Sequence, residues 1–394
     1  MATNGHVAVS YDDLERVGPG TLCGRYLRRF WQPLYRAQDL PAGRAKPITV
    51  LGEQFTLYRG QGGEPHLVDF RCAHRGVQLS VGWVEDDCIR CRYHGWRYDA
   101  SGQCVEQPGE EPGFAAKVAL RSYPVREYVG LIFAYLGDAE RGDTGAFRPP
   151  PFRRYPDLDR PGVVVTDPPE TVPCNFWNRL ENDVAHIAWV HRSTALRLGR
   201  TEFLTPRAEE FEETEYGFLM RRSAAGKPLS VDHWYMPNAF QFSVPVRARG
   251  YEHLGLWETK YTWTVPIDDE RFTAFDVTLT PLEGAAAEAY RAQRAAEQEA
   301  EAEVRWDLAE QILAGELTIE ELPDDVSHYN GFIIEDYVTQ VGQGAVRDRT
   351  HERLGRNDAK VAFMRRLWLR ELAALAQGKP GKEWQMPAEP LART

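Results

Sequence analysis

The chain has 394 residues, enough for two to three domains of ordinary size. Apolar residues make up 43% of it and charged residues 27%, a composition that excludes wholesale disorder and provides ample material for a buried core. With 47 basic and 58 acidic side chains, the net charge is -11, which argues against a general role in binding nucleic acid or anionic membranes.

Nothing in the sequence indicates export or a membrane span. No apolar run approaches the ~18 residues of a spanning helix, and the first residues lack the basic start and apolar stretch of a signal peptide. We therefore expect a cytoplasmic protein. Four of the six cysteines lie between positions 72 and 104, and clustered cysteines in a cytoplasmic chain indicate a metal site more often than disulfides.

The predicted elements change in character along the chain. Helical spacing over 11–30 is interrupted by glycine and proline at 18–20, and 45–136 shows short strands separated by turns. A proline-rich linker at 148–151 ends this part, and a mixture of helices and strands follows. The helices are predicted at 175–191, 285–314 and 361–375, and the strands at 218–222, 234–235, 240–244, 256–265 and 272–280.

Two short motifs in the strand-rich part each offer one thiolate and one imidazole. Cys72 and His74 form the first, and Cys91 and His94 form the second, after 16 residues that follow His74. Such a set can hold zinc tetrahedrally or a [2Fe-2S] cluster, with both cysteines on one iron and both histidines on the other. Three details favour the cluster: a cysteine–histidine spacing too tight for a zinc knuckle, turns in a strand-rich domain, and a glycine after each histidine.

The pair of motifs, with its flanking His-Arg-Gly and Tyr-His-Gly-Trp, resembles the Rieske family. Respiratory-chain members carry one further cysteine in each loop, and these form a disulfide. The matching positions here are Val77 and Tyr93, so the resemblance is to the oxygenase or ferredoxin branch. Of the remaining cysteines, Cys88 and Cys104 are interpreted as small buried residues.

A second candidate metal site follows the linker. Asp183, His186 and His191 lie in the predicted helix 175–191. Histidines five residues apart do not share one face of a regular helix, so both reach one ion only if the helix is distorted there. Taken alone, such histidines are usually ordinary polar residues.

After a Rieske motif, this spacing resembles the catalytic half of the Rieske non-haem iron oxygenases. The resemblance implies that His186, His191 and a distant carboxylate bind Fe(II) and leave open positions for O2. The run from 333 to 355 looks like the C-terminal signature of the phthalate-dioxygenase-like branch, which makes Asp336 the third ligand and Glu335 its rival. Asp183 matches the family's catalytic bridge between an iron histidine and a cluster histidine of the neighbouring subunit in a trimer.

The resemblance implies an α+β fold in three parts. Residues 1–30 are a helical segment, 31–145 an all-β Rieske domain and 146–394 a catalytic domain in which helices flank an antiparallel sheet. It further implies a terminal oxygenase that takes electrons from an external reductase or ferredoxin and uses O2 to hydroxylate or O-demethylate an aromatic small molecule. The alternative is a Rieske-type electron-transfer protein without catalytic iron, and a structural zinc protein is a third interpretation.

The predicted cluster loops carry local positive charge. Residues 71–97 contain five arginines and three acidic residues, whereas the whole chain has a net charge of -11. Opposite charges steer protein encounters, so we expect this surface to dock an acidic electron donor, with Arg75 and Arg92 as the residues to test. The motifs do not distinguish dihydroxylation, monohydroxylation and demethylation.

Overall fold

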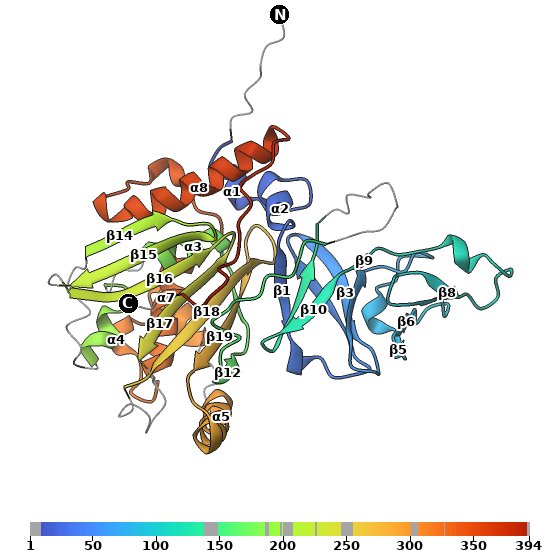
Figure 1. Cartoon of the computed structure of the whole chain (residues 1–394), viewed down its shortest axis with the longest axis horizontal. Helices are drawn as coiled ribbons and strands as arrows, with labels where there is room; N and C mark the ends of the chain where they lie inside the picture. The colour runs from blue at the N-terminus through green and yellow to red at the C-terminus, as the bar shows by residue number, and fades with distance from the viewer. Residues whose placement is uncertain are drawn as a thin grey trace, which may run out of the picture. The chain divides into compact units, whose positions relative to one another are not determined.

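The computed structural model describes residues 9–137, 149–185, 189–197, 199, 208–224, 227–245, 255–300, 306–326 and 328–391 (Figure 1). The chain divides into two compact units. The larger comprises Met1–Glu15, Arg154–Thr264 and Asp269–Thr394, and the smaller Arg16–Arg153 with Val265–Asp268. Among the described helices, none is long and apolar enough to cross a membrane.

The smaller unit consists of three small antiparallel sheets. One sheet has the order β1 (Trp31–Arg36), β11 (Leu131–Tyr135), β10 (Val125–Tyr128). The second has β2 (Ala45–Val50), β3 (Glu53–Arg59), β4 (Pro65–Asp69) and β9 (Ser122–Tyr123). The third has β5 (Trp83–Glu85), β6 (Cys88–Arg90), β7 (Arg97–Tyr98) and β8 (Cys104–Glu106). Helix α2 (Leu22–Leu27) precedes β1, capped by the Thr21 side chain.

A compact apolar core holds the smaller unit together around the predicted cluster loops. Its buried members include Cys72 and Cys91 with Tyr58, Trp96 and Tyr98. The predicted strand-rich region at 45–136 is therefore confirmed, and its core places both candidate thiols inside rather than at the surface.

A long antiparallel sheet forms the centre of the larger unit. Its order is β12-β19-β18-β17-β16-β15-β14, and β13 pairs with β19 at one edge. The strands are β12 (Val163–Thr166), β13 (Glu170–Val172), β14 (Ala208–Glu213), β15 (Gly217–Ala224), β16 (Lys227–Tyr235), β17 (Ala239–Pro245), β18 (Trp257–Pro266) and β19 (Phe272–Thr280). Alternating aromatic residues bury both faces: Phe218, Trp234 and Phe240 on one, and Tyr235, Tyr261 and Trp263 on the other.

Helices pack on this sheet and on one another (Figure 1). They are α1 (Asp12–Glu15), α3 (Phe176–Ala185), α4 (Arg192–Arg197), α5 (Gly284–Ala300), α6 (Trp306–Ala314), α7 (His328–Val341) and α8 (Ala359–Ala376). Helix α8 meets the sheet through Phe363, whose ring contacts Phe211 and Phe218. It meets α3 through the Trp177–Trp368 ring pair, with centroids 5.2 Å apart. The predicted α+β fold is confirmed.

Two predicted helices differ in detail from the structure. The helix expected over 175–191 ends at Ala185, residues 186–188 lie outside the described residues, and α4 begins at Arg192 after a turn. Residues 189–191, which precede α4, form a turn rather than a regular helix. The helix expected over 285–314 is described as α5 and α6, on either side of the undescribed residues 301–305.

Candidate metal centres

The two cysteine–histidine loops have the same backbone hydrogen bonds. The amide of Gly76 donates to the carbonyl of Cys72 at 3.0 Å, and that of Gly95 donates to Cys91 at 3.0 Å. The amide of Cys72 donates to the carbonyl of Val77, and that of Cys91 donates to the carbonyl of Trp96, each at 2.8 Å. Both glycines have φ near +74°, a left-handed conformation that disfavours any side chain. Glycine at these positions is thus a requirement of the turn, which the sequence predicted.

The side chains of these loops fit a [2Fe-2S] cluster. Cys72 and Cys91 are buried, and the His74 and His94 rings lie edge to face with centroids 4.5 Å apart. His74 stacks on Trp96, and its Nδ1 is buried without a hydrogen-bond partner among the described residues. A buried imidazole nitrogen without a partner is costly unless a ligand takes it, and a metal is the ligand that suits this donor set.

The four candidate ligand residues form two pairs, because the rings of His74 and His94 contact each other and the side chains of Cys72 and Cys91 interact. Among the described residues, no three histidine, cysteine or acidic side chains gather closely enough to hold a single ion. A two-iron cluster separates its thiolates from its imidazoles, so this arrangement favours the cluster over tetrahedral zinc. The hydroxyl of Tyr98 lies 3.2 Å from Cys72 Sγ and is able to donate to a ligating thiolate. Sequence reasoning missed this contact.

All six cysteines are free thiols. Cys104 is buried, as predicted, whereas Cys88 is partly exposed at the start of β6. Burial raises the pKa of both thiols, which makes them poor nucleophiles at neutral pH. Neither thiol therefore adds a second reactive centre beside the candidate cluster.

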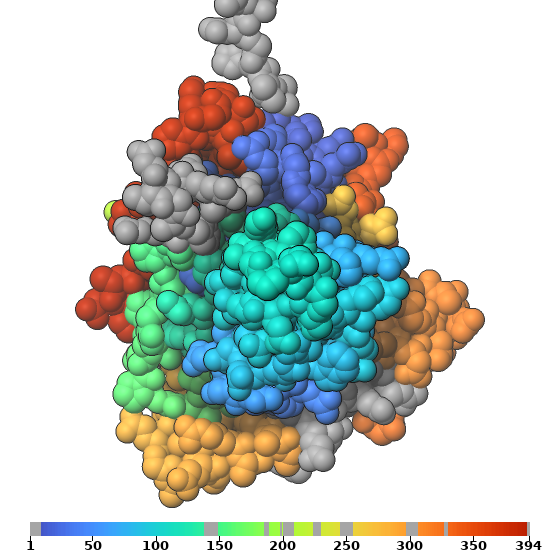
Figure 2. Space-filling view, turned by 90° about the vertical axis from the view of Figure 1, so that its right-hand side faces the viewer, coloured from blue at the N-terminus to red at the C-terminus, as the bar shows by residue number. Residues whose placement is uncertain are grey.

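The local positive charge around the loops is smaller than the count over residues 71–97 indicated. Figure 2 draws this part of the chain in light blue to teal. Arg90 forms ion pairs with Glu85 at 2.9 Å and with Glu106 at 2.8 Å, and Arg97 lies within 4 Å of the same two carboxylates. Glu106 lies outside residues 71–97 and was therefore absent from that count. Arg75 and Arg92 remain exposed, and each guanidinium lies over an exposed ring, Tyr93 and Trp83 respectively.

In the larger unit, His191 and Asp336 come together from distant parts of the chain. His191 Nε2 lies 3.7 Å from Asp336 Oδ1, a separation that one metal ion can bridge. Asn182 on α3 donates its side-chain amide to the same Asp336 oxygen at 3.2 Å. His186, the other predicted ligand, lies outside the described residues. Both side chains are partly exposed, 15% for His191 and 20% for Asp336.

Glu335, the rival to Asp336, has a different environment. It is fully buried, and its two oxygens already have partners: Oε2 lies 3.1 Å from His191 Nδ1, and Oε1 accepts the Thr194 amide at 2.9 Å. The two adjacent carboxylates therefore approach opposite nitrogens of the same imidazole.

Asp183 lies on α3, buried, and pairs with Arg179 at 2.9 Å through one carboxylate oxygen. Its other oxygen, Oδ2, is buried and accepts no hydrogen bond from the described residues. Burial, opposed by Arg179, raises the pKa of Asp183 to about 7. A buried acceptor of this kind is suited to a donor that the described residues do not supply.

Glu181 on α3 takes part in an ion-pair network that the sequence did not predict. Glu181 Oε1 accepts from Arg365 at 2.7 Å and from Arg349 at 3.0 Å, and Arg347 also pairs with this carboxylate. Glu352 in turn forms a two-pronged pair with Arg365. The C-terminal signature run thus contributes arginines that hold the helix of Asp183. Nothing in the local sequence pattern indicated these partners.

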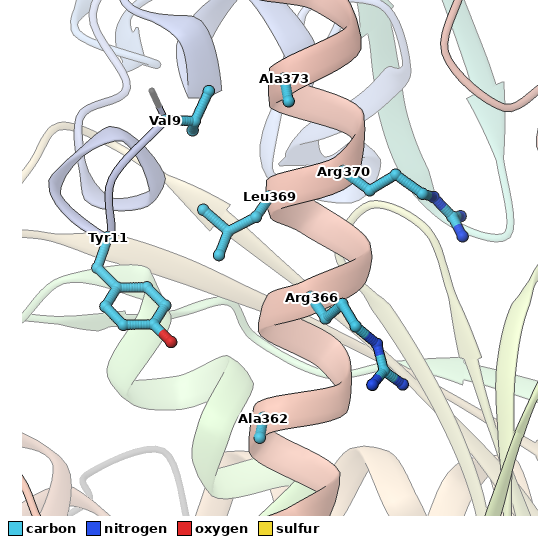
Figure 3. Close-up of a pocket in the computed structure, with 7 residues that line it drawn as sticks. All are labelled: Val9, Tyr11, Ala362, Arg366, Leu369, Arg370 and Ala373. Carbon is cyan, nitrogen blue, oxygen red and sulfur yellow. The ribbon is translucent and has the colours of Figure 1, made fainter. Parts of the chain in front are cut away.

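Two further features are separate from the candidate ligands. His233 is buried in β16, and its Nδ1 lies 2.8 Å from the Tyr216 hydroxyl, as expected of an ordinary strand residue; His253 lies outside the described residues. A hollow of about 410 Å³ lies along α8 (Figure 3). Its lining, Val9, Tyr11, Ala362, Arg366, Leu369, Arg370 and Ala373, includes no candidate ligand, so we do not assign it to the substrate.

Comparison with known proteins identifies the family of the chain. Residues 30–124 match the Rieske [2Fe-2S] domain. The chain is 30% identical to the 5,5'-dehydrodivanillate O-demethylase oxygenase subunit of Sphingobium sp. (strain NBRC 103272 / SYK-6), over 94% of this chain and 81% of that protein. It is 29% identical to the phenoxybenzoate dioxygenase subunit alpha of Ectopseudomonas oleovorans, over 93% and 85% of the two chains.

A solved structure shares the fold of both units. An oxygenase of carbazole 1,9a-dioxygenase, seen in complex with its ferredoxin, matches with a TM-score of 0.58 at 20% identity, over 89% of this chain and 92% of that one. The chain belongs to the Rieske non-haem iron oxygenases, and it is the terminal oxygenase subunit of a multicomponent system. The alternative of a pure electron-transfer protein finds no support in these relatives.

Proposed function

We propose that this oxygenase holds its mononuclear Fe(II) with His186, His191 and Asp336, and its [2Fe-2S] cluster with Cys72 and Cys91 on one iron and His74 and His94 on the other. Bound there, Fe(II) supplies the redox chemistry that activates O2. The observation that carries the proposal is the approach of His191 Nε2 to Asp336 Oδ1, at 3.7 Å, beside the Asp183 helix. Asn182 orients the Asp336 carboxylate.

Metal and sulfide analysis of the anaerobically purified protein tests this assignment. We expect about three irons and about two acid-labile sulfides per chain, with the red-brown colour of the cluster. His191→Ala and Asp336→Ala should each lose about one iron and keep the sulfide. His351→Ala, which removes an exposed histidine, is the control. Two irons in the wild type, unchanged after Fe(II) is added, would refute the second site.

The substrate we propose is an aromatic carboxylic acid. Two relatives that match almost the whole chain are named for such compounds, one for dehydrodivanillate and one for phenoxybenzoate. Because one is an O-demethylase and the other a dioxygenase, both reactions belong in the screen. Substrate-dependent O2 uptake with a surrogate reductase, compared between benzoate-type acids and their amides, tests the class. Equal uptake with the amides would contradict it.

We further propose that Asp183 is the bridge between the two centres in a homotrimer. Its buried Oδ2 lacks a donor among the described residues of this chain, which suits a cluster histidine of a neighbouring copy. Asp183→Asn should keep both metals and the trimer but stop turnover, because the amide no longer accepts on both oxygens. Normal coupled turnover in this variant, or a monomer in the wild type by light scattering, would refute the bridge.

The electron donor is proposed to be an acidic reductase or ferredoxin that docks beside Arg75 and Arg92. Both guanidiniums are exposed, and Tyr93 beneath Arg75 contacts the His94 ring, with centroids 3.8 Å apart. Replacing Arg75 and Arg92 by Glu should slow cluster reduction and remove most of its salt dependence. Arg126→Glu, a reversal at another exposed site of the same unit, controls for net charge. Unchanged rates and salt dependence would contradict docking here.

A further inference from the structure

Glu335 contacts both the side chain of the proposed iron ligand His191 and the backbone amide of nearby Thr194. It is 0% exposed, and each of its carboxylate oxygens has one partner. Oε2 lies 3.1 Å from His191 Nδ1, and Oε1 accepts the backbone amide of Thr194 at 2.9 Å. Thr194 is the third residue of α4, so this amide is one of those that a helix leaves without an internal partner. Glu335 thus connects α7 to residues 191–194 through one side chain and one backbone amide.

The donor and acceptor roles in this contact fix the form of the histidine. An ionised carboxylate accepts hydrogen bonds and donates none, so the His191 nitrogen that faces it must carry the hydrogen. A neutral imidazole with its hydrogen on Nδ1 has its free lone pair on Nε2. That nitrogen is the one that lies 3.7 Å from Asp336 Oδ1. Phe332 meets the ring edge to face, with centroids 4.8 Å apart, and limits its rotation.

We propose that Glu335 is a positioning residue, which holds His191 in the tautomer and orientation for metal binding and is not itself a ligand. This inference rests on the mononuclear iron site of the proposed function. Consecutive residues of a helix point about 100° apart, so Glu335 and Asp336 reach the ring from different sides. One turn of α7 therefore supplies the partner of Nδ1 and the carboxylate that faces Nε2.

The alternative, in which Glu335 binds the metal, requires both of its present contacts to break. The Thr194 amide would then be a buried donor without a partner, and His191 Nδ1 would lose its acceptor. Asp336 needs no such change, because its side chain is 20% exposed and Asn182 is the one hydrogen-bond donor to its carboxylate among the described residues, at Oδ1. Carboxylate–histidine pairs behind metal ligands have this division of roles in many proteins.

The substitution Glu335→Gln separates these possibilities because an amide has only one acceptor oxygen. If that oxygen faces His191, the amide nitrogen opposes the Thr194 N–H, and both groups are donors. If it faces Thr194, the amide nitrogen donates to His191 Nδ1 and moves the ring hydrogen to Nε2, where it blocks the metal. In either arrangement a contact is lost, and metal affinity should fall by about 10- to 100-fold.

The measurement uses the full-length protein with its cluster intact. The mononuclear iron is removed with a chelator, and the protein is titrated with Co(II), whose visible spectrum reports affinity and geometry. Glu320→Gln is the matched control, because it removes an exposed carboxylate that contacts the neighbouring Ser193 hydroxyl at 2.7 Å. We expect Glu335→Gln to bind Co(II) weakly with an altered spectrum, Glu320→Gln to match the wild type, and cluster absorption to be retained in both.

A nitrogen NMR spectrum of the histidines, assigned with His191→Gln, reads the tautomer without any metal. The wild type should carry its hydrogen on Nδ1. Wild-type Co(II) affinity in Glu335→Gln, or an Nε2–H tautomer in the wild type, would overturn the positioning role. Complete loss of binding in Glu335→Gln with retention in Asp336→Asn would make Glu335 the ligand and also overturn it. A wild type that binds no third metal would refute the iron site itself, whereas the tautomer measurement would still test this inference.

Discussion

The hydroxyl of Tyr98 offers the sharpest test of how the protein tunes its cluster. Tyr98 is fully buried in the core of the smaller unit, 3.2 Å from Cys72 Sγ. When Cys72 ligates iron as a thiolate, the hydroxyl is the donor of this hydrogen bond. Reduction adds an electron to the cluster and makes the sulfur a better acceptor, so the bond stabilises the reduced state more than the oxidised one. Tyr98→Phe should therefore lower the reduction potential.

The size of the shift follows from the strength of such bonds. A hydrogen bond to a charged group contributes about 1.5–3 kcal/mol, and we take roughly 1–1.5 kcal/mol of this as the difference between the two redox states. For a one-electron couple, about 1.4 kcal/mol corresponds to about 59 mV. Tyr98→Phe should then lower the potential by roughly 40–65 mV.

An equilibrium redox titration followed by visible circular dichroism measures this shift. Tyr58→Phe is the matched control, because Tyr58 is also fully buried in the same core but donates to the Asp87 carbonyl at 3.1 Å instead of to a ligand. It should lose stability and keep the wild-type potential. A Tyr98→Phe potential within roughly 10 mV of the wild type, or an equal shift in Tyr58→Phe, would refute the reasoning.

Other predictions concern buried charge and backbone conformation. Burial raises the pKa of Glu170 to about 7 from an ordinary 4.5, so the folded state binds a proton that the unfolded state has released between these values, and stability falls as pH rises through that window. Glu170→Gln should thus gain stability over the wild type by at most about 3 kcal/mol at pH 8 and by little at pH 4.5, measured by urea unfolding. Glu181→Gln should cost about 1–3 kcal/mol, because it removes one carboxylate that the arginines share while Glu352 and Glu15 remain as partners; a loss below about 0.5 kcal/mol in urea would contradict this. Gly76→Ala should cost about 1–2 kcal/mol for its positive φ, and Gly95→Ala should cost more, because a Cβ there would lie 3.1 Å from a Pro108 carbon; equal melting temperatures of the two variants would contradict the difference.

The strand-rich part and the cluster motif could be predicted from sequence because their determinants are local. Each loop closes with hydrogen bonds between residues no more than five positions apart, and each turn needs its glycine. Residue types and spacing therefore carry nearly all the information. The five-residue spacing of His186 and His191 also indicated, from local sequence alone, that both can bind one ion only if the helix is distorted there.

Charge on the surface of the cluster unit was overestimated from sequence. The count over 71–97 gave five arginines against three acids, but the fold of β6–β8 brings Glu106 to Arg90 and Arg97. A linear window cannot include a partner that arrives through strand pairing. Arg71, Arg75 and Arg92 remain exposed, and the guanidiniums of Arg75 and Arg92 each lie over an exposed ring.

The sequence by itself determined the class of the protein, through two ligand motifs whose chemistry depends on short spacings. It left Asp336 and Glu335 as rivals, because two adjacent carboxylates look alike in a linear pattern. Only the tertiary structure gives them different surroundings. Helix α7 turns by about 100° between the two residues and packs against α4, so one carboxylate meets Nδ1 of His191 and the other faces Nε2. Contacts between residues 144 positions apart depend on packing, which no local spacing encodes.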